Sequence, residues 1–224
     1  MGSNKSLDWI VDLDNAHDPK YGEPFQVPIV AATNENFKEY GNLVTDFDAE
    51  EVEIVPWPVM GRRPLCNGTG IFGGVAEGDF LHEWVGDKCK ATSTAIGWGV
   101  DSDFFICRLG KGVDPDHKTR VLVREANNHP DGSQCFFPKE KLPFVALFAL
   151  PGDDVKLEDF MAFYSDGSFG FHIRPNVWHQ PMIPVSQKAV FRNKQGAVHA
   201  CVGLDTVNEF GRFLSVPLKI HKAE

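Results

Sequence analysis

The sequence predicts an all-β fold, either a sandwich or a barrel. From residue 61 onward, short apolar runs are separated by Gly, Pro, Asn and Asp, which are turn-forming residues. The chain has 224 residues without an internal repeat, a low-complexity tract or a linker, and all-β domains of this length are commonly single. The eight clearest predicted strands are Ser93–Val100, Phe104–Leu109, Thr119–Glu125, Phe144–Leu150, Phe160–Tyr164, Phe169–Ile173, Val198–Leu204 and Arg212–Leu218.

The segments before residue 61 are less regular. Residues 1–28 are polar and contain Pro, so we expect an N-terminal arm lying on a single domain formed by residues 29–224. A short helix is predicted over Thr33–Gly41, capped by Thr33 or Asn34 and ended by Gly41. Residues 42–60 are acidic and then Pro-rich, which predicts an edge strand or a loop. One further helical turn is expected at Leu157–Phe160.

Charge and cysteine content narrow the functional classes. The net charge is −9 and no basic run occurs, which argues against a nucleic-acid groove or an anionic membrane surface. No apolar run approaches the roughly 18 residues of a membrane span. The five cysteines include no Cys-x-x-Cys, and the first residues contain no apolar signal segment. We therefore expect a reduced, cytoplasmic protein.

One polar constellation stands out. Asn127 and His129 are two positions apart, so on a strand they project from the same face. Gln134 follows after a Pro-Asp-Gly-Ser turn and would rejoin them, and His179 comes from a second segment. Glu125 shares the parity of Asn127, so in the same pocket it would serve as a general base. We interpret these residues as an active or binding centre, against the alternative of ordinary hydrogen-bonding residues beside turns.

Residues around His179 supply further candidates. His172 and Arg174 share one face of a predicted strand, and an Arg fork facing a cavity would hold a carboxylate. Trp178 would wall the pocket. The alternatives stay open here, since Arg174 would equally be an exposed strand residue and Trp178 a packing residue.

Two other motifs in the sequence do not predict a functional site. Gly68–Gly73 fits Gly-x-Gly-x-x-Gly but lies in no βαβ unit, so it predicts a turn. His82 is followed by Glu83, but the second His of a zinc protease helix is absent, so the motif does not predict a protease.

The constellation resembles a known family. The spacings are similar to the paired motifs of cupins, and the combination resembles ureidoglycolate lyase over most of residues 33–205. The resemblance implies a double-stranded β-helix (a cupin jelly-roll barrel), often a homodimer. It also implies cleavage of ureidoglycolate to glyoxylate and urea in the allantoin branch of purine catabolism, sometimes with a divalent metal. The residues that carry it are Asn36–Gly41, His129–Pro138, Pro151–Asp153, Ala162–Gly167 and Asn176–Met182.

Residue by residue, His129, Gln134 and His179 match the family pattern. Asn127 stands where the family usually has Glu, and Gln180 where it commonly has a second His. Two imidazoles with neutral amides are weak metal ligands, so we expect at most a loosely bound divalent metal on His129, Gln134 and His179.

Under this resemblance, a small polar acid is the substrate. His179 or His129 would carry the proton, while Gln134 and Asn127 would orient the ureido group, with Arg174, His172, Trp178 and Gln180 as further substrate contacts. Two alternatives remain: a cupin enzyme of another type, such as an isomerase or metal-dependent oxygenase, and a non-catalytic small-molecule-binding cupin.

Overall fold

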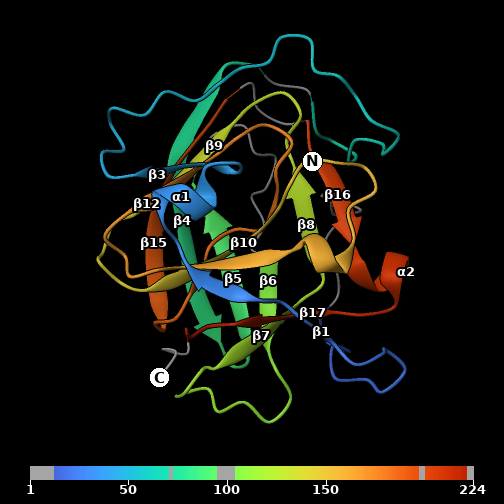
Figure 1. Ribbon diagram of the computed structural model, residues 1–224. Coiled ribbons are helices and arrows are strands. Elements are labelled where there is room, and N and C mark those ends of the chain that lie inside the picture. Colours follow the sequence, from blue (N-terminus) through green and yellow to red (C-terminus); the bar gives the residue numbers. More distant parts are fainter. Residues whose placement is uncertain (1–12, 71–72, 95–103, 197–199, 221–224) are drawn as a thin grey trace, which may run out of the picture.

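The computed structural model describes residues 13–70, 73–94, 104–196 and 200–220. Within them the chain forms 17 strands and three short helical segments, so the expected all-β class is confirmed (Figure 1). The helical segments are α1 (Asn34–Phe37), the 3₁₀ turn η1 (Leu157–Asp159) and α2 (Thr206–Phe210). No helix in the described ranges is long and apolar enough to cross a bilayer.

The strands form two sheets. The larger has ten strands, in the spatial order β1 (Phe25–Gln26), β17 (Leu214–Pro217), β7 (Arg120–Val123), β6 (Phe104–Leu109), β5 (Lys88–Ser93), β4 (Val75–Val85), β15 (Lys188–Gly196), β9 (Gln134–Pro138), β12 (Gly170–Ile173) and β3 (Gly41–Val44). The smaller has the order β16 (Val202–Asp205), β8 (Glu125–Asn128), β13 (Trp178–His179), β10 (Phe144–Ala149), β11 (Met161–Ser165) and β2 (Ile29–Ala31), with β14 (Ile183–Pro184) also pairing with β10.

Most predicted strands are present. The runs at Phe104, Phe144, Phe160, Phe169 and Arg212 correspond to β6, β10, β11, β12 and β17. The run from Thr119 is divided into β7 in the larger sheet and β8 in the smaller one. Parts of the runs Ser93–Val100 and Val198–Leu204 lie outside the described residues. The sequence reading missed β4 and β15, whose alternating polar residues hide two long strands that pair over nine positions.

Helix α1 is shorter than predicted. The Thr33 hydroxyl accepts the Asn36 N–H while the Asn36 side chain accepts the Thr33 N–H, a reciprocal cap that starts the helix. The helix ends at Phe37 rather than at Gly41. Gly41 instead begins β3, where a Cβ would lie 1.7 Å from the His172 carbonyl oxygen. Gly is required there by close strand approach and not as a helix stop.

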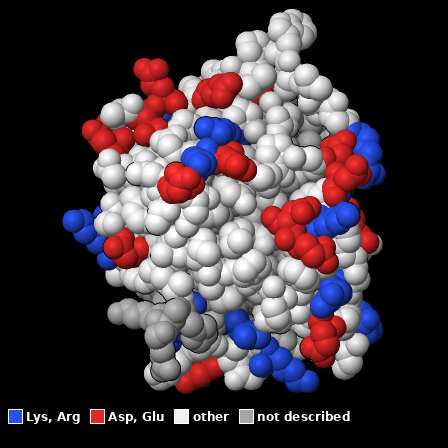
Figure 2. All heavy atoms as spheres, viewed as in Figure 1, with Lys and Arg blue, Asp and Glu red and all other residues white. Residues whose placement is uncertain are grey.

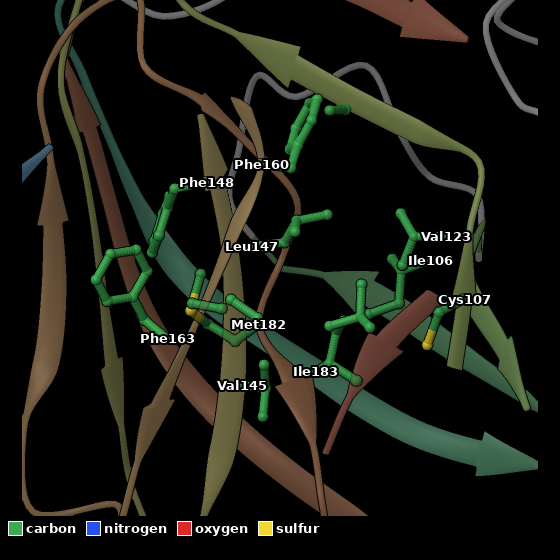
Figure 3. Close-up of a cluster of buried hydrophobic side chains, with 14 of the residues drawn as sticks. Ile106, Cys107, Val123, Val145, Leu147, Phe148, Phe160, Phe163, Met182 and Ile183 are labelled. Atoms are coloured by element: carbon green, nitrogen blue, oxygen red, sulfur yellow. The ribbon is translucent and has the colours of Figure 1, made fainter. Parts of the chain in front are cut away.

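The core lies between the sheets and is rich in phenylalanine. Figure 3 shows Val145, Leu147 and Phe148 of β10 gathered with Met182 and Ile183. All five are 0% exposed, so burial of apolar side chains supplies the main stabilisation.

Residues 45–70 form a strap that crosses the upper edge of the molecule in Figure 1. It contains no extended strand, as expected for a loop, but Ile54 bridges Gly132 and Leu65 bridges Val202. Gly132 permits the close approach of the strap, because a Cβ there would lie 3.0 Å from the Glu53 carbonyl oxygen. The strap thereby holds the turn between β8 and β9.

Part of the expected arm is attached to the body. β1 pairs in parallel with β17, and Leu13 and Ala16 pack with Leu122 and Phe213. The division at residue 28 remains a prediction, and residues 1–12 lie outside the described part.

Charges are dispersed on the face drawn in Figure 2, where Lys and Arg lie beside Asp and Glu around a largely uncharged centre. The ion pairs of the described residues include Lys139 with Asp79 and Arg192 with Asp48.

We predict acid sensitivity from His82, which is 0% exposed between Phe80 and Phe191. Burial lowers the pKa of His82 from 6.5 to about 4. Below pH 6.5 the unfolded chain therefore binds a proton that the folded protein does not, and stability falls as pH drops from 6.5 to 4. The loss from this one group is about 3 kcal/mol.

Urea denaturation at pH 7 and at pH 4.5 measures this loss. His179 has the same shift, so we expect His82→Leu to remove about half of the acid sensitivity of these two groups. An unchanged pH dependence in His82→Leu would contradict the assignment.

Candidate functional site

A small buried cavity, here termed the inner cavity, lies between the two sheets. β4, β6, β9 and β15 of the larger sheet line it, as do β8 and β13 of the smaller one. Its volume is about 60 Å³, and one water needs roughly 10–15 Å³, so it suits a small molecule. Phe80, Phe104 and Phe136 form much of its apolar wall.

The four residues of the predicted constellation meet in this cavity. Asn127 and His179 are direct partners across β8 and β13, and His129 follows at the end of β8. The ring centroids of His129 and His179 are 5.1 Å apart, and His179 Nε2 lies 2.9 Å from the Gln134 side-chain oxygen. The expected convergence is therefore observed, because β8 and β13 are neighbours and β9 faces them from the other sheet.

His179 has a defined tautomer. Its Nδ1 lies 2.8 Å from the Val177 carbonyl, which only accepts, so Nδ1 carries a proton. Burial lowers the pKa of His179 to about 4, which leaves Nε2 as an unprotonated acceptor at neutral pH. The Gln134 amide must then turn its NH₂ toward Nε2, since two acceptors would repel. Nε2 has one lone pair, so a ligand must displace the Gln134 amide before this neutral His can accept a proton.

Glu125 enters the same cavity from β8. Burial, and then the neighbouring Cys66 and Asp205, raise the pKa of Glu125 well above its usual value. A raised pKa favours the protonated form of the carboxyl group, which suits the role of an acid, while the general-base role expected from the sequence stays a prediction. A carboxyl group with a raised pKa and an imidazole with a lowered pKa in one cavity can act as an acid–base pair.

Two glutamines complete the polar lining. Gln180 follows His179, and its amide donates to the Glu125 carbonyl. Gln195 is directly opposite Gln134 across β15 and β9, and is 1% exposed. Its Oε1 has no hydrogen-bond partner among the described residues, nor has Asn127 Oδ1. Sequence reasoning missed Gln195 because β15 itself was missed; the alternation of Phe191, Asn193 and Gln195 with charged residues was the available signal.

The central part of the chain matches a known family. Residues 102–204 match the family model described as ureidoglycolate lyase. The resemblance to ureidoglycolate lyase is confirmed over this stretch. Ureidoglycolate lyases of Salmonella enteritidis, Salmonella newport and Salmonella paratyphi A are each 39% identical over 62 residues, which is 28% of this chain. The matched region spans 39% of the length of each of these relatives.

Two candidates within the ureidoglycolate lyase-like stretch lie away from the cavity. Phe171 and Ile173 of β12 are 0% exposed, so His172 between them points to the opposite face. Arg174 is exposed beyond the end of β12, where its guanidinium donates to the Glu39 carbonyl at 3.4 Å. The structure therefore does not bring His172 and Arg174 into the inner cavity with the other predicted site residues. Strand parity had correctly grouped the two residues but did not show which face was internal.

His172 instead forms hydrogen bonds that connect the strap to the turn before β9. Its Nδ1 lies 2.7 Å from Glu50 Oε2 and its Nε2 lies 2.9 Å from Ser133 Oγ. The order Ser–His–carboxylate is that of a hydrolase triad, but Ser133 is 1% exposed and its hydroxyl also accepts the Glu53 N–H. The enclosed hydroxyl indicates a structural role.

Trp178, which was predicted to form a wall of the pocket, also lies away from the inner cavity. Adjacent strand residues face opposite ways, so Trp178 points away from the cavity that His179 enters. Its Nε1 donates to the Gly152 carbonyl at 2.9 Å, and the Arg63 guanidinium lies 5.3 Å from its ring. Trp178 is thus a packing residue.

The donor set of the inner cavity suits a divalent metal only weakly. His129, His179, Gln134 and Asn127 would supply two imidazoles and two neutral amides, and the unpartnered Asn127 Oδ1 is available. No group of three or more His, Cys, Asp or Glu that could hold a metal occurs within the described ranges. A metal bound there would polarise substrate oxygens.

Proposed function

We propose that this protein cleaves ureidoglycolate, or a close ureido-hydroxy acid, to glyoxylate and urea. The main support for this proposal is that the stretch matching ureidoglycolate lyase contains His129, Gln134 and His179, which converge in one small buried cavity. The relatives' printed names refer to whole proteins of which this match spans 39%, so the activity of this chain is our inference.

His179 is the base in the proposed reaction. Its neutral Nε2 takes the proton from the hydroxyl group of the substrate carbon that also bears the ureido nitrogen. The oxygen electrons form the carbonyl of glyoxylate, and the carbon–nitrogen bond breaks. The Nδ1–H bond to Val177 stabilises the imidazolium that results, because the carbonyl dipole faces the developing charge.

Glu125 is the acid. Urea leaves more readily when its departing nitrogen is protonated, and the neutral Glu125 carboxyl group supplies that proton. The proton held by His179 then returns to Glu125 directly or through the products, which restores the starting state.

The amides recognise the ureido group. A urea fragment has one acceptor oxygen and several N–H donors, so it needs both kinds of partner. Gln195 Oε1 and Asn127 Oδ1 accept from its N–H groups, since both are buried without other partners among the described residues. No Lys or Arg occurs in the described lining. The substrate carboxylate is therefore held by amide and imidazole N–H groups or by a metal.

We propose further that the two sheets form the double-stranded β-helix of cupins, with residues 29–224 as one domain and residues 1–28 as its arm. We also propose that the protein is a homodimer and that it is cytoplasmic. The antiparallel pairing within both sheets supports the β-helix, and the five free cysteines support the reduced compartment.

The direct test is an assay of the full-length protein with ureidoglycolate, with and without added Mg²⁺ or Mn²⁺, measuring urea and glyoxylate separately. We expect both products in equal amounts, above the spontaneous rate of a protein-free control. Release of neither product would refute the lyase proposal and favour another cupin enzyme or a binding protein.

We predict that Gln195→Leu raises KM for ureidoglycolate by about 10- to 100-fold with a smaller change in kcat, because a lost buried hydrogen bond costs about 1–3 kcal/mol. Steady-state kinetics measure this. Gln187→Leu is the matched control, since Gln187 bonds the Trp84 carbonyl outside the inner cavity. Equal effects in the two variants would contradict substrate contact by Gln195.

We predict weak metal binding. The purified protein should hold less than one equivalent of divalent metal, removable by a chelator, because neutral amides confer little affinity. Elemental analysis and calorimetry measure this, and Asn127→Glu should tighten binding by adding an anionic ligand. Stoichiometric metal that resists chelation would show that His129, Gln134 and His179 are stronger ligands than we propose.

A further inference from the structure

Two cysteines face each other beside the inner cavity, and one of them, Cys201, lines it. Leu65 bridges Val202, which makes Cys66 of the strap the direct antiparallel partner of Cys201. The Cys66 N–H donates to the Cys201 carbonyl at 2.7 Å, and the two thiols are hydrogen-bonded to each other. Opposite residues in antiparallel strands have Cα atoms about 4.5–5.5 Å apart, which lies within the range of about 4.4–6.8 Å that a disulfide spans.

The two thiols differ in access. Cys66 is partly exposed and lines a second, larger space, here termed the outer cavity, of about 560 Å³. Cys201 is buried and lines the inner cavity, and Glu125 lines both spaces. A small solute in the outer cavity therefore reaches Cys66 first, with Cys201 directly behind it.

The electrostatics support a reactive thiol at Cys66. The hydrogen bond from Cys201 lowers the pKa of Cys66, while the same bond and burial raise the pKa of Cys201 well above the usual value. The thiolate is the nucleophile in thiol oxidation, so Cys66 is the attacking residue and Cys201 the resolving one.

The chain contains its own comparison. Cys89 and Cys107 are also direct partners, on β5 and β6, but both are 0% exposed. Burial raises the pKa of Cys107 well above the usual value. Opposed geometry is thus common to both pairs, whereas Cys66 is the one partly exposed thiol among these four residues.

We propose that Cys66 and Cys201 form a site of reversible oxidation, which takes hydrogen peroxide as its oxidant and closes a disulfide across the wall between the two cavities. This chemistry is independent of the lyase activity proposed above.

The reaction balances in two steps. The Cys66 sulfur attacks one peroxide oxygen, the O–O bond breaks, and the departing hydroxide is protonated to water, which leaves a sulfenic acid on Cys66. The Cys201 sulfur then attacks the Cys66 sulfur, the S–O bond breaks, and the hydroxide leaves as water with the Cys201 proton. Two thiols lose two electrons and two protons, and one peroxide becomes two waters.

The consequence lies beside the candidate site. The disulfide ties the strap covalently to the residues preceding β16, and it removes the Cys66 thiol as a charge-bearing neighbour of Glu125. Thr69, whose hydroxyl bonds the Cys66 carbonyl and accepts the Cys201 N–H, is held in the same wall.

The test uses the wild-type, reduced, full-length protein titrated with hydrogen peroxide, alkylated, digested with trypsin and analysed by mass spectrometry. The five cysteines fall in five different tryptic peptides, with Cys66 in residues 63–88 and Cys201 in residues 195–212. We expect these two peptides to become linked, at least about tenfold faster than Cys89 and Cys107 are lost. Dithiothreitol should reverse the link.

A second variant keeps the result interpretable. In Cys201→Ser, Cys66 should accumulate as a sulfenic acid that dimedone labels, because its resolving thiol is absent. Equal reactivity of the two pairs, stable oxidation of Cys66 without a link to Cys201, or no dimedone label in Cys201→Ser would each overturn the proposal. None of these measurements uses ureidoglycolate, so they stand apart from the lyase assay.

Discussion

His179→Ala is expected to lower kcat for ureidoglycolate cleavage by about 100- to 10,000-fold, the usual contribution of a positioned acid–base group. Its Nε2 is the neutral acceptor in the inner cavity, held in place by the Nδ1 bond to Val177. His129→Ala should cause a loss of similar size, because the His129 ring lies 5.1 Å from that of His179 and lines the same cavity. Steady-state kinetics with separate measurement of urea and glyoxylate provide the test.

The matched control for both variants is His117→Ala. His117 is exposed and pairs with Asp114 far from any proposed chemistry, so its loss should leave kcat within experimental error. Thermal unfolding of all three proteins separates activity from stability. If the two cavity variants lose stability in proportion to activity, the imidazoles are structural and the proton-transfer role is wrong.

Glu125→Gln is expected to produce the second large effect, again about 100- to 10,000-fold in kcat. Burial raises the pKa of the wild-type carboxyl group well above the usual value, which favours its neutral form, so an amide of the same shape preserves packing and removes only the transferable proton. Full activity in Glu125→Gln would exclude this residue as the acid.

The pH profile identifies the role independently. In the free wild-type enzyme, kcat/KM should fall as pH rises through the elevated pKa of Glu125, because the acid loses its proton. It should also fall on the acid side near pH 4, where His179 becomes protonated. Glu125→Gln should lose the basic limb and keep the acid limb, while Glu158→Gln, an exposed substitution, should keep both.

Much of the candidate site was predictable because it depends on local spacing. Asn127 and His129 share a strand face by parity alone, and the short turn at Pro130–Ser133 returns the chain to place Gln134 beside them. The family resemblance allowed His179, about 45 residues after Gln134, to be assigned to the same site. The family match itself covers this segment, in which the strands and turns are short and the motif residues are close in sequence.

The errors arose where the assignment depended on which face of a strand is internal. Parity grouped His172 with Arg174 correctly, but β12 presents Phe171 and Ile173 to the core. Gln195 was missed for a related reason, since it reaches the cavity only because β15 pairs with β9. The local sequence pattern does not show which distant segments pair as neighbouring strands.

The sequence by itself determined the all-β class, most of the short strands and the motif that places two histidines and two amides in one centre. It did so because turn residues and strand parity are local properties of the chain. Only the tertiary structure decided that the pKa of Glu125 is raised, that the pKa of His179 is lowered, and that Cys66 lies opposite Cys201. These properties depend on burial and on contacts between segments far apart in sequence, and desolvation of a charged group exists only once the surrounding core has formed.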